Sequence, residues 1–474
     1  MKKLNEAPST PAPLSRRAAK VAKTRGLILS AARKVFTRHS FASASIRLIE
    51  EEGGFNHSAI YYHFKTKSEL FEAVVRELYA EYLADSIDLI NEGGRAALRD
   101  DLSRTIDRML DFGFQKPAIL KIMMLNIGET DHIKEMAGGF HYFQKYSETI
   151  YGLFIKNHSF CATKRTITMW ISAFHILCTN YLGSPELYKQ ALYMGVEDEK
   201  YRRFIKHTLM LIFYPSLKGL VVKDLYPPNR ISGEKMKKKT SPEDKAKQLA
   251  AKGPVPAAKG DISRARILEV ARAVFARSPY NSASIRMIGE AGDFDFTLLY
   301  HYFPTKADLF EAVIENIFAD LSFFVEHITI EMNEGAIRES LSLLIDSVVN
   351  YFWTRSESFM VCMQNIAQID SLQDFPGTHH LLKIIMNTQD QYRLTNEAAN
   401  EEIQGLIYGM GTILINLIGA PTLYGRIIGM DPKSPGYKRW IKDLLMFVFY
   451  PSLKEHLLRW PDLYGKPFAS LETT

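Results

Sequence analysis

The sequence predicts an all-α fold made of two similar units in tandem. Apolar residues recur at spacings of three and four through most of the chain, as in helices with one buried face. No convincing succession of alternating strands is visible. Sliding the 474-residue sequence along itself by 239 positions makes residues 25–76 and 264–315 identical at 26 of 52 positions. We therefore expect two copies of one helical unit, each of roughly 200 residues.

The composition narrows the class of protein. Of all residues, 46% are hydrophobic and 24% are charged, which is typical of a globular protein rather than a disordered one. The three cysteines form no C-x-x-C pair, which disfavours a disulfide scaffold and favours a reducing compartment. The N-terminus lacks the apolar stretch of a signal peptide. These features predict a cytoplasmic protein.

No catalytic or metal-binding motif is visible in the sequence. It contains no G-x-S-x-G, no glycine-rich phosphate loop after a strand and no H-E-x-x-H, and its 13 histidines are scattered. We expect neither an enzyme nor a bound cofactor or metal. Two rival classes stay open, an enzyme that a stoichiometric metal would reveal and a helical protein attached to a membrane.

The first element in the chain is a basic arm, residues 1–25. It contains seven Lys or Arg residues and one acidic residue, a net charge of +6. Residues 230–264 contain ten basic and four acidic residues, so they also carry +6, and the rest of the chain is acidic. This pattern predicts a polyanionic partner at two places. Both stretches contain prolines and are expected to be disordered without that partner. When DNA is the partner, they either follow its phosphates or add only non-specific affinity.

After each arm the sequence predicts three helices. The first spans residues 28–36, and the same apolar spacing recurs over 267–275. A short helix is expected over residues 45–52, where Gly54 can take the left-handed conformation that ends it. Asn56 is a good N-cap for a second short helix. Two short helices joined by a tight turn form a helix-turn-helix, which places its second helix in the major groove of DNA.

A longer helix is expected after each motif. Thr66 and Glu69 have the spacing of a capping box at a helix start, and Thr305 and Asp308 repeat it with a shorter acid. Helical spacing continues through the remainder of each unit. Between the units, residues 221–260 are rich in Lys, Pro, Gly and Ala, which is typical of a linker.

Residues 28–71 and 267–310 resemble the DNA-binding domain of the tetracycline-repressor (TetR) family. The residues that carry the resemblance are Ile28, Ala32, Phe36, Ile49, Gly54, Tyr61, His63, Phe64, Lys67 and Leu70, and Ile267, Ala271, Phe275, Ile288, Tyr300, Phe303, Lys306 and Leu309. The resemblance implies helix-turn-helix domains at residues 26–65 and 261–304, and helical regulatory and dimerisation domains at residues 66–220 and 305–474. It also implies a transcription regulator that binds double-stranded operator DNA, a repressor released by a small-molecule effector.

The resemblance further implies which side chains meet DNA. Arg47 would reach a base or a phosphate, the residues that start the second short helix would face base edges, and Tyr62, His63 and Lys67 would grip phosphates. The implied DNA-binding residues of the first unit are Arg47, Asn56, His57, Ser58, Ala59, Tyr61, Tyr62, His63 and Lys67. Those of the second unit are Arg286, Phe296, Thr297, Leu298, Tyr300, His301, Tyr302 and Lys306.

The two expected reading surfaces differ from each other. Residues 56–60 and 295–299 share no residue, although the surrounding motif is half identical. Unlike readers favour two different half-sites and hence an asymmetric operator, because a homodimer needs a pseudo-palindromic one. Asp293 stands where Gly54 provides the turn, and carboxylates near phosphates weaken DNA binding. The alternative is that only unit 1 reads DNA and unit 2 is an interaction or ligand-sensing module.

Two stretches without charge, Thr166–Pro185 and Ile403–Gly425, occupy matching places late in each unit. Their length is about that of a membrane span. A helix covered by its own unit on one side and by a partner on the other would be equally apolar. We therefore expect them at an interface, either between the two units of one chain as a pseudo-dimer or, alternatively, between two chains with four motifs.

An effector pocket is implied by the resemblance alone. Aromatic and Met residues of the helical domains are candidates for its lining, although such residues are more often ordinary core. The candidates are Phe112, Met123, Phe140, Trp170, Phe174, Phe352, Trp353 and Met363.

Overall fold

The computed structural model describes residues 16–92, 98–127, 145, 148–153, 155–156, 162–192, 198–221, 259–327, 337–366, 375–380 and 396–463. Every regular element in these ranges is helical, which confirms the all-α fold class. The helices of unit 1 are α1 (Arg16–Phe36), α2 (Ile46–Gly53), α3 (His57–His63), α4 (Lys67–Glu92), α5 (Leu98–Gln115), α6 (Ala118–Asn126), α8 (Lys164–Gly183), α9 (Pro185–Ala191) and α10 (Asp198–Val221).

The helices of unit 2 repeat this order. They are α12 (Lys259–Phe275), α13 (Ile285–Gly292), α14 (Phe296–Tyr302), α15 (Lys306–His327), α16 (Ile337–Trp353), α17 (Ser356–Ile366), α19 (Glu397–Gly419), α20 (Pro421–Ile428) and α21 (Pro435–Arg459), followed by a short 3-10 helix, Pro461–Leu463.

One expectation about the basic arms is wrong. Helix α1 begins at Arg16, so residues 16–25 of the predicted disordered arm are helical. This stretch has no proline and consists largely of Ala, Arg and Lys, which are strong helix formers. The preceding residues, 1–15, lie outside the described residues, as do residues 222–258 of the linker.

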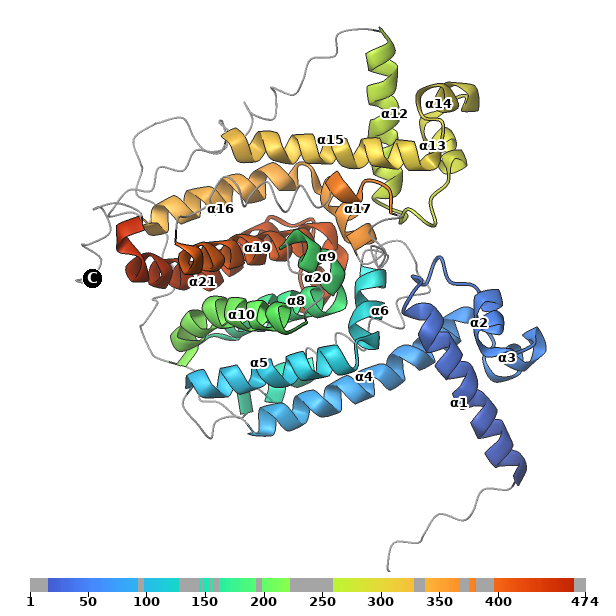
Figure 1. Cartoon of the computed structure of the whole chain (residues 1–474), viewed down its shortest axis with the longest axis horizontal. Helices are drawn as coiled ribbons and strands as arrows, with labels where there is room; N and C mark the ends of the chain where they lie inside the picture. Colours follow the sequence, from blue (N-terminus) through green and yellow to red (C-terminus); the bar gives the residue numbers. More distant parts are fainter. Residues whose placement is uncertain are drawn as a thin grey trace, which may run out of the picture.

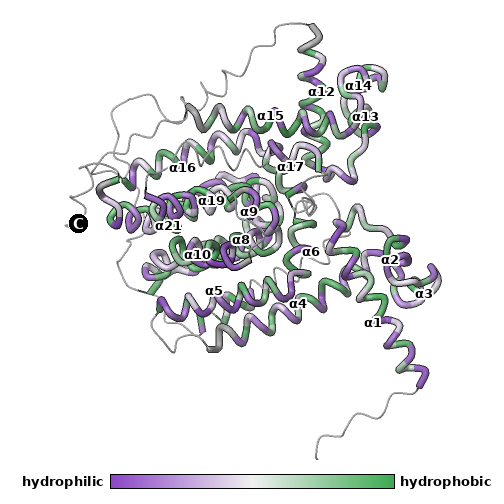
Figure 2. Tube along the Cα trace, viewed as in Figure 1, coloured by the Kyte–Doolittle hydropathy of each residue, from purple (hydrophilic) through white to green (hydrophobic). Residues whose placement is uncertain are grey.

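The body of the protein is a stack of helices with the two units on opposite sides (Figure 1). Helices α8 and α10 of unit 1 lie against α19 and α21 of unit 2 in the middle of the stack. The outer helices α4, α5 and α15 alternate hydrophobic and hydrophilic residues, as helices with one buried face do (Figure 2). Both helix-turn-helix domains extend from the same end of the body, α1–α3 on one side and α12–α14 on the other (Figure 1).

The uncharged stretches lie in this middle layer, as parts of α8, α19 and α20. Helix α19 is long and apolar enough to cross a membrane, but 67% of its most apolar window is buried inside the protein. The Nδ2 of Asn180 donates a hydrogen bond to the Oδ1 of Asn416 over 3.2 Å, and both residues are buried. These asparagines are 236 residues apart, which is the offset between the repeated segments late in each unit. Each therefore meets its own counterpart across the boundary between the units.

Unit 2 has a buried polar cluster that unit 1 lacks. The carboxylate of Glu402 accepts hydrogen bonds from Nδ1 of His456 over 2.7 Å and Nε1 of Trp460 over 3.1 Å, and from Arg459. Burial alone would raise the pKa of Glu402, but the hydrogen bonds from His456 and Trp460 and the charge of Arg459 hold it below its ordinary value. At the 236-residue offset, unit 1 has Thr166 in place of the carboxylate. The cluster therefore breaks the symmetry of the repeat.

Each helix-turn-helix domain is fastened to its helical domain by a buried asparagine. The Oδ1 of Asn126, at the end of α6, accepts from the backbone N–H of Phe41 over 2.7 Å. In unit 2, Asn365 accepts from the N–H of Tyr280 over 2.9 Å. Helices α6 and α17, which carry these asparagines, also contact each other across the boundary between the units. The anchor points of the two helix-turn-helix domains therefore lie on helices that touch.

Close helix packing depends on two glycines at corresponding positions, and it generates a stability prediction. A Cβ on Gly183 would lie 2.9 Å from the carbonyl oxygen of Leu120, and one on Gly419 would lie 2.7 Å from that of Phe359. Because backbone must then move, Gly183→Ala and Gly419→Ala are each expected to lower the free energy of unfolding by about 1–3 kcal/mol, as overpacking does. Denaturant titration of the whole chain measures this.

The matched control is Gly411→Ala in the same helix as Gly419. A Cβ at Gly411 meets nothing within 4 Å. Since alanine favours helix over glycine by about 1 kcal/mol, this variant should be neutral or more stable. Equal effects at Gly411 and Gly419 would contradict the packing explanation.

Candidate nucleic-acid interface

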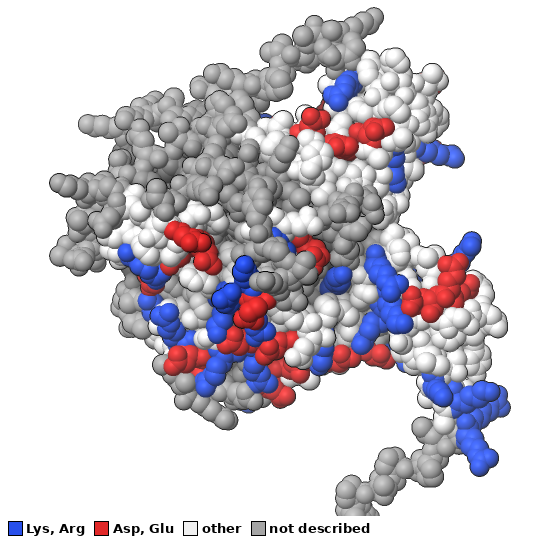
Figure 3. Space-filling model, viewed as in Figure 1, with Lys and Arg blue, Asp and Glu red and all other residues white. Residues whose placement is uncertain are grey.

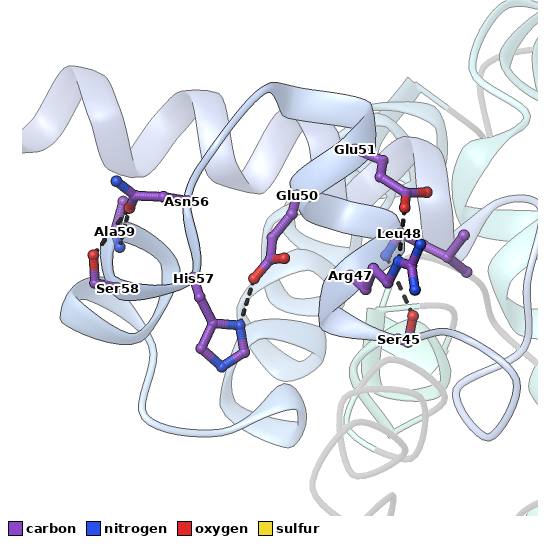
Figure 4. A network of polar contacts seen from close by, with 9 residues as sticks. All are labelled: Ser45, Arg47, Leu48, Glu50, Glu51, Asn56, His57, Ser58 and Ala59. Carbon is purple, nitrogen blue, oxygen red and sulfur yellow. Dashed lines mark hydrogen bonds and ion pairs between the residues drawn. The ribbon is translucent and has the colours of Figure 1, made fainter.

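The helix-turn-helix of unit 1 is set by local hydrogen bonds (Figure 4). Ser45 caps α2 by accepting from the N–H of Leu48 over 3.2 Å. Gly54 ends α2 with φ of 67°, the left-handed conformation expected of it. Asn56 caps α3 by accepting from the N–H of Ala59 over 2.9 Å, as its sequence position predicts. The turn and both helix starts are thus encoded within about a dozen residues.

The side chains of α3 divide into an anchor and a reading face. Ile60 is fully buried and holds the helix on the core, whereas Asn56, His57, Ser58, Tyr61 and Tyr62 are exposed. Ala59 and His63 are half-buried. The exposed members of the predicted set therefore share one outward surface.

A short contact links the two helices of the motif at this surface. The Nδ1 of His57 lies 2.5 Å from the Oε1 of Glu50 in α2 (Figure 4). This contact fixes the imidazole ring and leaves Nε2 as the nitrogen for another partner. Arg47 points away with 84% of its side chain exposed and pairs with Glu51 over 2.9 Å. Exposed ion pairs of this kind are weak, so a phosphate or base can take the guanidinium over.

Unit 2 builds the same motif with different residues. Ser284 caps α13, and Asp293 ends it with φ of 52°, the only positive φ of a non-glycine residue in the described chain. Asp295 caps α14 by accepting from the N–H of Thr297 over 2.7 Å, and this hydrogen bond holds the pKa of Asp295 below its ordinary value. The left-handed conformation of Gly54 is therefore retained at Asp293, although Asp tolerates this backbone less easily than Gly.

The outward face of α14 is apolar. Phe296, Leu298 and Tyr300 are 46%, 36% and 52% exposed. The other predicted contacts of unit 2 also lie outward, with Thr297 and His301 exposed and Tyr302 half-buried. Arg286 extends into solvent beside them and pairs with Glu290 over 2.8 Å.

Among the differences between the two motifs, one involves two residues that contact each other. At the 239-residue offset, Gly289 stands in place of Glu50 and Phe296 in place of His57. A Cβ on Gly289 would come within 3.1 Å of the Phe296 ring. The ring therefore packs closely over Gly289, whereas in unit 1 the corresponding residues form the Glu50–His57 contact. The sequence did not reveal this coupling, because the two positions lie on different helices.

Lys67 and Lys306, two of the predicted phosphate contacts, hydrogen-bond the loop that precedes each motif. The Nζ of Lys67 donates to the carbonyl oxygens of Phe41 and Ala44 over 2.7 and 2.9 Å. Lys306 repeats this with Tyr280 and Ala283, and burial lowers the pKa of Lys306. Each ammonium ties the loop before the motif to the start of the next helix. The geometry gives these lysines a structural role, and the phosphate contact stays a prediction.

Basic side chains gather at the N-terminal end of α1 (Figure 3). Arg16, Arg17, Lys20 and Lys23 are exposed on this helix, which precedes α2 and α3. Arg25 stacks on the ring of Phe64 at the end of α3, 4.9 Å from its centroid. In unit 2, Arg264 stacks on Phe303 in the same way. The described part of α12 holds fewer basic residues, so the cationic surface is uneven between the units.

Among the expected effector-pocket residues, Phe112 lines a cavity of about 350 Å3. This cavity is also lined by Arg33, Thr37, Leu78, Glu81, Gln115, Lys116, Pro117, Ala118, Ile119 and Lys121. Trp170 and Phe174 stack on each other in the core, with ring centroids 5.1 Å apart. Met123, Met363 and Phe352 are buried and Trp353 is half-buried against α21, while Phe140 lies outside the described residues.

One group of residues was missed by sequence reasoning, which found no clustered metal ligands. Glu311, His379 and His380 have ligand atoms that all lie within 4.8 Å of one another. Glu311 is distant in sequence from the two histidines, so no motif spacing could have revealed the group.

Comparison with known proteins agrees with these two motifs. The family model described as "Bacterial regulatory proteins, tetR family" matches residues 28–74 and again residues 267–313. Curated relatives named "HTH-type transcriptional repressor AcnR", from Corynebacterium efficiens and Corynebacterium glutamicum, are 42% identical over 50 residues. That match covers 10% of this chain and 27% of each relative, so the chain matches only about a quarter of their length. The AcnR of Corynebacterium diphtheriae matches equally well.

The left-handed turn of α13 generates a paired prediction. Because an L-residue other than glycine is strained at positive φ, Asp293→Gly should raise the free energy of unfolding by about 0.5–1 kcal/mol. Gly54→Asp in unit 1 is the reverse change and should lower it by a similar amount. Thermal or denaturant unfolding of both variants checks the signs. A destabilised Asp293→Gly protein would show that the Asp293 side chain stabilises the turn in another way.

The two half-buried lysines generate a second prediction. Lys67→Met leaves the carbonyls of Phe41 and Ala44 without their charged donor, so the free energy of unfolding should fall by about 1–3 kcal/mol. Lys65→Met, two residues away and exposed, is the control and should change it little. If the two variants unfold alike, the ammonium of Lys67 does not hold the loop.

Proposed function

Because both halves of the chain carry a DNA-binding domain of the tetR family, we propose that the protein is a sequence-specific DNA-binding transcription regulator with two unlike readers in one chain. The observation that carries the proposal is the exposed outer face of α3 and α14, each held on a capped helix-turn-helix. The relatives' name describes a transcriptional repressor, which favours repression as the outcome. Such regulators work in the cytoplasm.

An asymmetric operator follows from the chemistry of the two faces. His57 and Ser58 can exchange hydrogen bonds with base edges in the major groove. Phe296 and Leu298 can make only apolar contacts there, for example with thymine methyl groups. The coupled pairs Glu50–His57 and Gly289–Phe296 support a change of reading chemistry rather than loss of the motif.

We propose that the two units form the dimer-like assembly within one chain. The packing of α8 and α10 on α19 and α21 buries the helices that a tetR-like subunit would otherwise offer to a second copy. Both DNA-binding domains then leave the same end of the body, as two readers of one DNA segment must (Figure 1). The molar mass of the protein–DNA complex in solution is expected to correspond to one chain per operator. Two chains per operator would favour the alternative assembly with four motifs.

Release by a small-molecule effector would act on the anchors of the DNA-binding domains. The cavity at Phe112 is lined by Arg33 and Thr37 of the DNA-binding domain as well as by residues of α4 and of α5 and α6. A ligand there would alter the angle at which α1 leaves the body. In the alternative function, unit 2 makes no DNA contact and uses the apolar face of α14 for another partner.

The operator itself is the first test of the proposed function. Selection of binding sites from random DNA should return two half-sites with different sequences. The double variant Glu50→Gly/His57→Phe gives unit 1 the pair found in unit 2, so it should change one half-site and leave the other. Asp111→Ala, on the outer surface of the body, is the control and should leave both unchanged. A perfect palindrome for the natural protein would contradict two unlike readers.

The charge of α1 generates a prediction about salt. Replacing Arg16, Arg17, Lys20 and Lys23 by Ala keeps a helix-forming sequence but removes four exposed cations. The slope of log affinity against log salt should fall by about 0.9 for each phosphate that α1 no longer neutralises. Lys433→Ala/Arg439→Ala, exposed on the body, is the control with an unchanged slope. An unchanged slope in the quadruple variant would mean that α1 does not meet phosphates.

A further inference from the structure

A group of metal-ligand side chains lies beside the second DNA-binding domain. Glu311 comes from α15, and His379 and His380 come from the helical residues 378–380 that follow the turn at residues 375–377, a segment here called the turn segment, 375–380. The Nδ1 of His379 lies 3.7 Å from the Oε1 of Glu311, and the two imidazole rings have centroids 3.8 Å apart. Two imidazoles and a carboxylate thus face a common point from two separate elements.

The backbone that presents the histidines is fixed by packing. The ring of Phe375 lies 5.5 Å from that of Phe310 in α15 and 5.6 Å from that of Tyr280. Gly377, with φ of 72°, lets the turn segment lie directly on Ile314, where a Cβ would come within 3.1 Å. The Oγ1 of Thr378 donates to the carbonyl of Phe375 over 2.6 Å. This turn segment is therefore seated on α15 before any ligand is present.

We propose that Glu311, His379 and His380 form a binding site for a divalent transition-metal ion such as Zn2+. Two histidines and one carboxylate are a known zinc donor set, which leaves one position open to water or another ligand. In a tetrahedral site the donor atoms are about 3.3 Å apart, given metal–ligand bonds of 2.0–2.1 Å. The side chains of Glu311 and His379 are 44% and 56% exposed, so they can rotate the short distance needed. The backbone can stay where it is.

The corresponding positions of unit 1 hold only part of this set of metal donors. At the 239-residue offset, Glu72 and His141 correspond to Glu311 and His380, but Phe140 stands in place of His379. Unit 1 therefore lacks one of the three donors, and the proposal assigns a single ion to each chain. His379→Phe is the variant that gives unit 2 the residue of unit 1.

Metal binding would stiffen the contact between the turn segment and α15. The same helix begins at Lys306, which holds the loop before the second helix-turn-helix through Tyr280 and Ala283. An ion held by Glu311 and the two histidines would therefore restrain the second DNA-binding domain. This regulatory consequence rests on the proposed function, whereas the metal site itself does not.

The test uses the full chain and needs no DNA. Zn2+ is titrated by calorimetry, and Co2+ is titrated by its visible absorption, which reports tetrahedral coordination by protein ligands. The expected result is one ion per chain, with binding weakened at least tenfold in His379→Phe and in Glu311→Gln. His207→Gln, a half-exposed histidine outside the group, should bind as the natural protein does. Circular dichroism confirms that each variant is folded.

Two outcomes would overturn the proposal. One is the absence of binding by the natural protein up to millimolar metal, and the other is equal affinity in His379→Phe. For regulation, a DNA affinity that changes with Zn2+ in the natural protein and not in His379→Phe is the expected result. A metal-dependent change that persists in His379→Phe would contradict the coupling. A chain that binds Zn2+ but no DNA would refute the proposed function and leave the metal site intact.

Discussion

The apolar contact between the two units is the constraint on which the rest of the structure depends. Residues 166–183 of α8 and 403–419 of α19 carry no charge, and these helices are covered by α6, α10, α17 and α21 and by each other. Asn180 and Asn416 are among the buried polar residues of this contact, and their mutual hydrogen bond joins corresponding positions of the two units. Hydrophobic burial therefore holds the units together, and the asparagine pair specifies how they align.

Hydrogen bonds from α6 and α17 connect the aligned units to the helix-turn-helix domains. The end of α6 holds Phe41 through Asn126, and the end of α17 holds Tyr280 through Asn365. Because α6 and α17 also contact each other, a shift at the boundary between the units moves both anchors. Lys67 and Lys306 then fix the loops that lead into the motifs. No single flexible joint separates the core from the reading surfaces within the described residues.

The features that the sequence predicts well are those with local causes. Gly54, Asn56 and the Thr66 cap act on residues a few positions away, so their roles can be predicted from spacing. The absence of charge over residues 166–185 reflects the burial of α8 directly. Features that depend on partners distant in the sequence cannot be predicted in this way. The hydrogen bonds from Lys67 to the carbonyls of Phe41 and Ala44 join residues more than 20 positions apart, so spacing does not reveal them. Glu311 meets His379 only because the chain returns to α15, and the Phe296 ring needs Gly289 from another helix.

The duplication has a consequence for assembly at low abundance. A regulator made of separate subunits falls apart when its concentration drops below the dissociation constant, and its subunits can exchange with related proteins. When both partners lie in one polypeptide, their pairing is unimolecular and does not depend on dilution. The interface also no longer needs to complement itself, so one side can acquire groups such as the Glu402 cluster that the other side lacks. A chain of this kind retains its two unlike helix-turn-helix motifs in a fixed one-to-one ratio even at a few copies per cell.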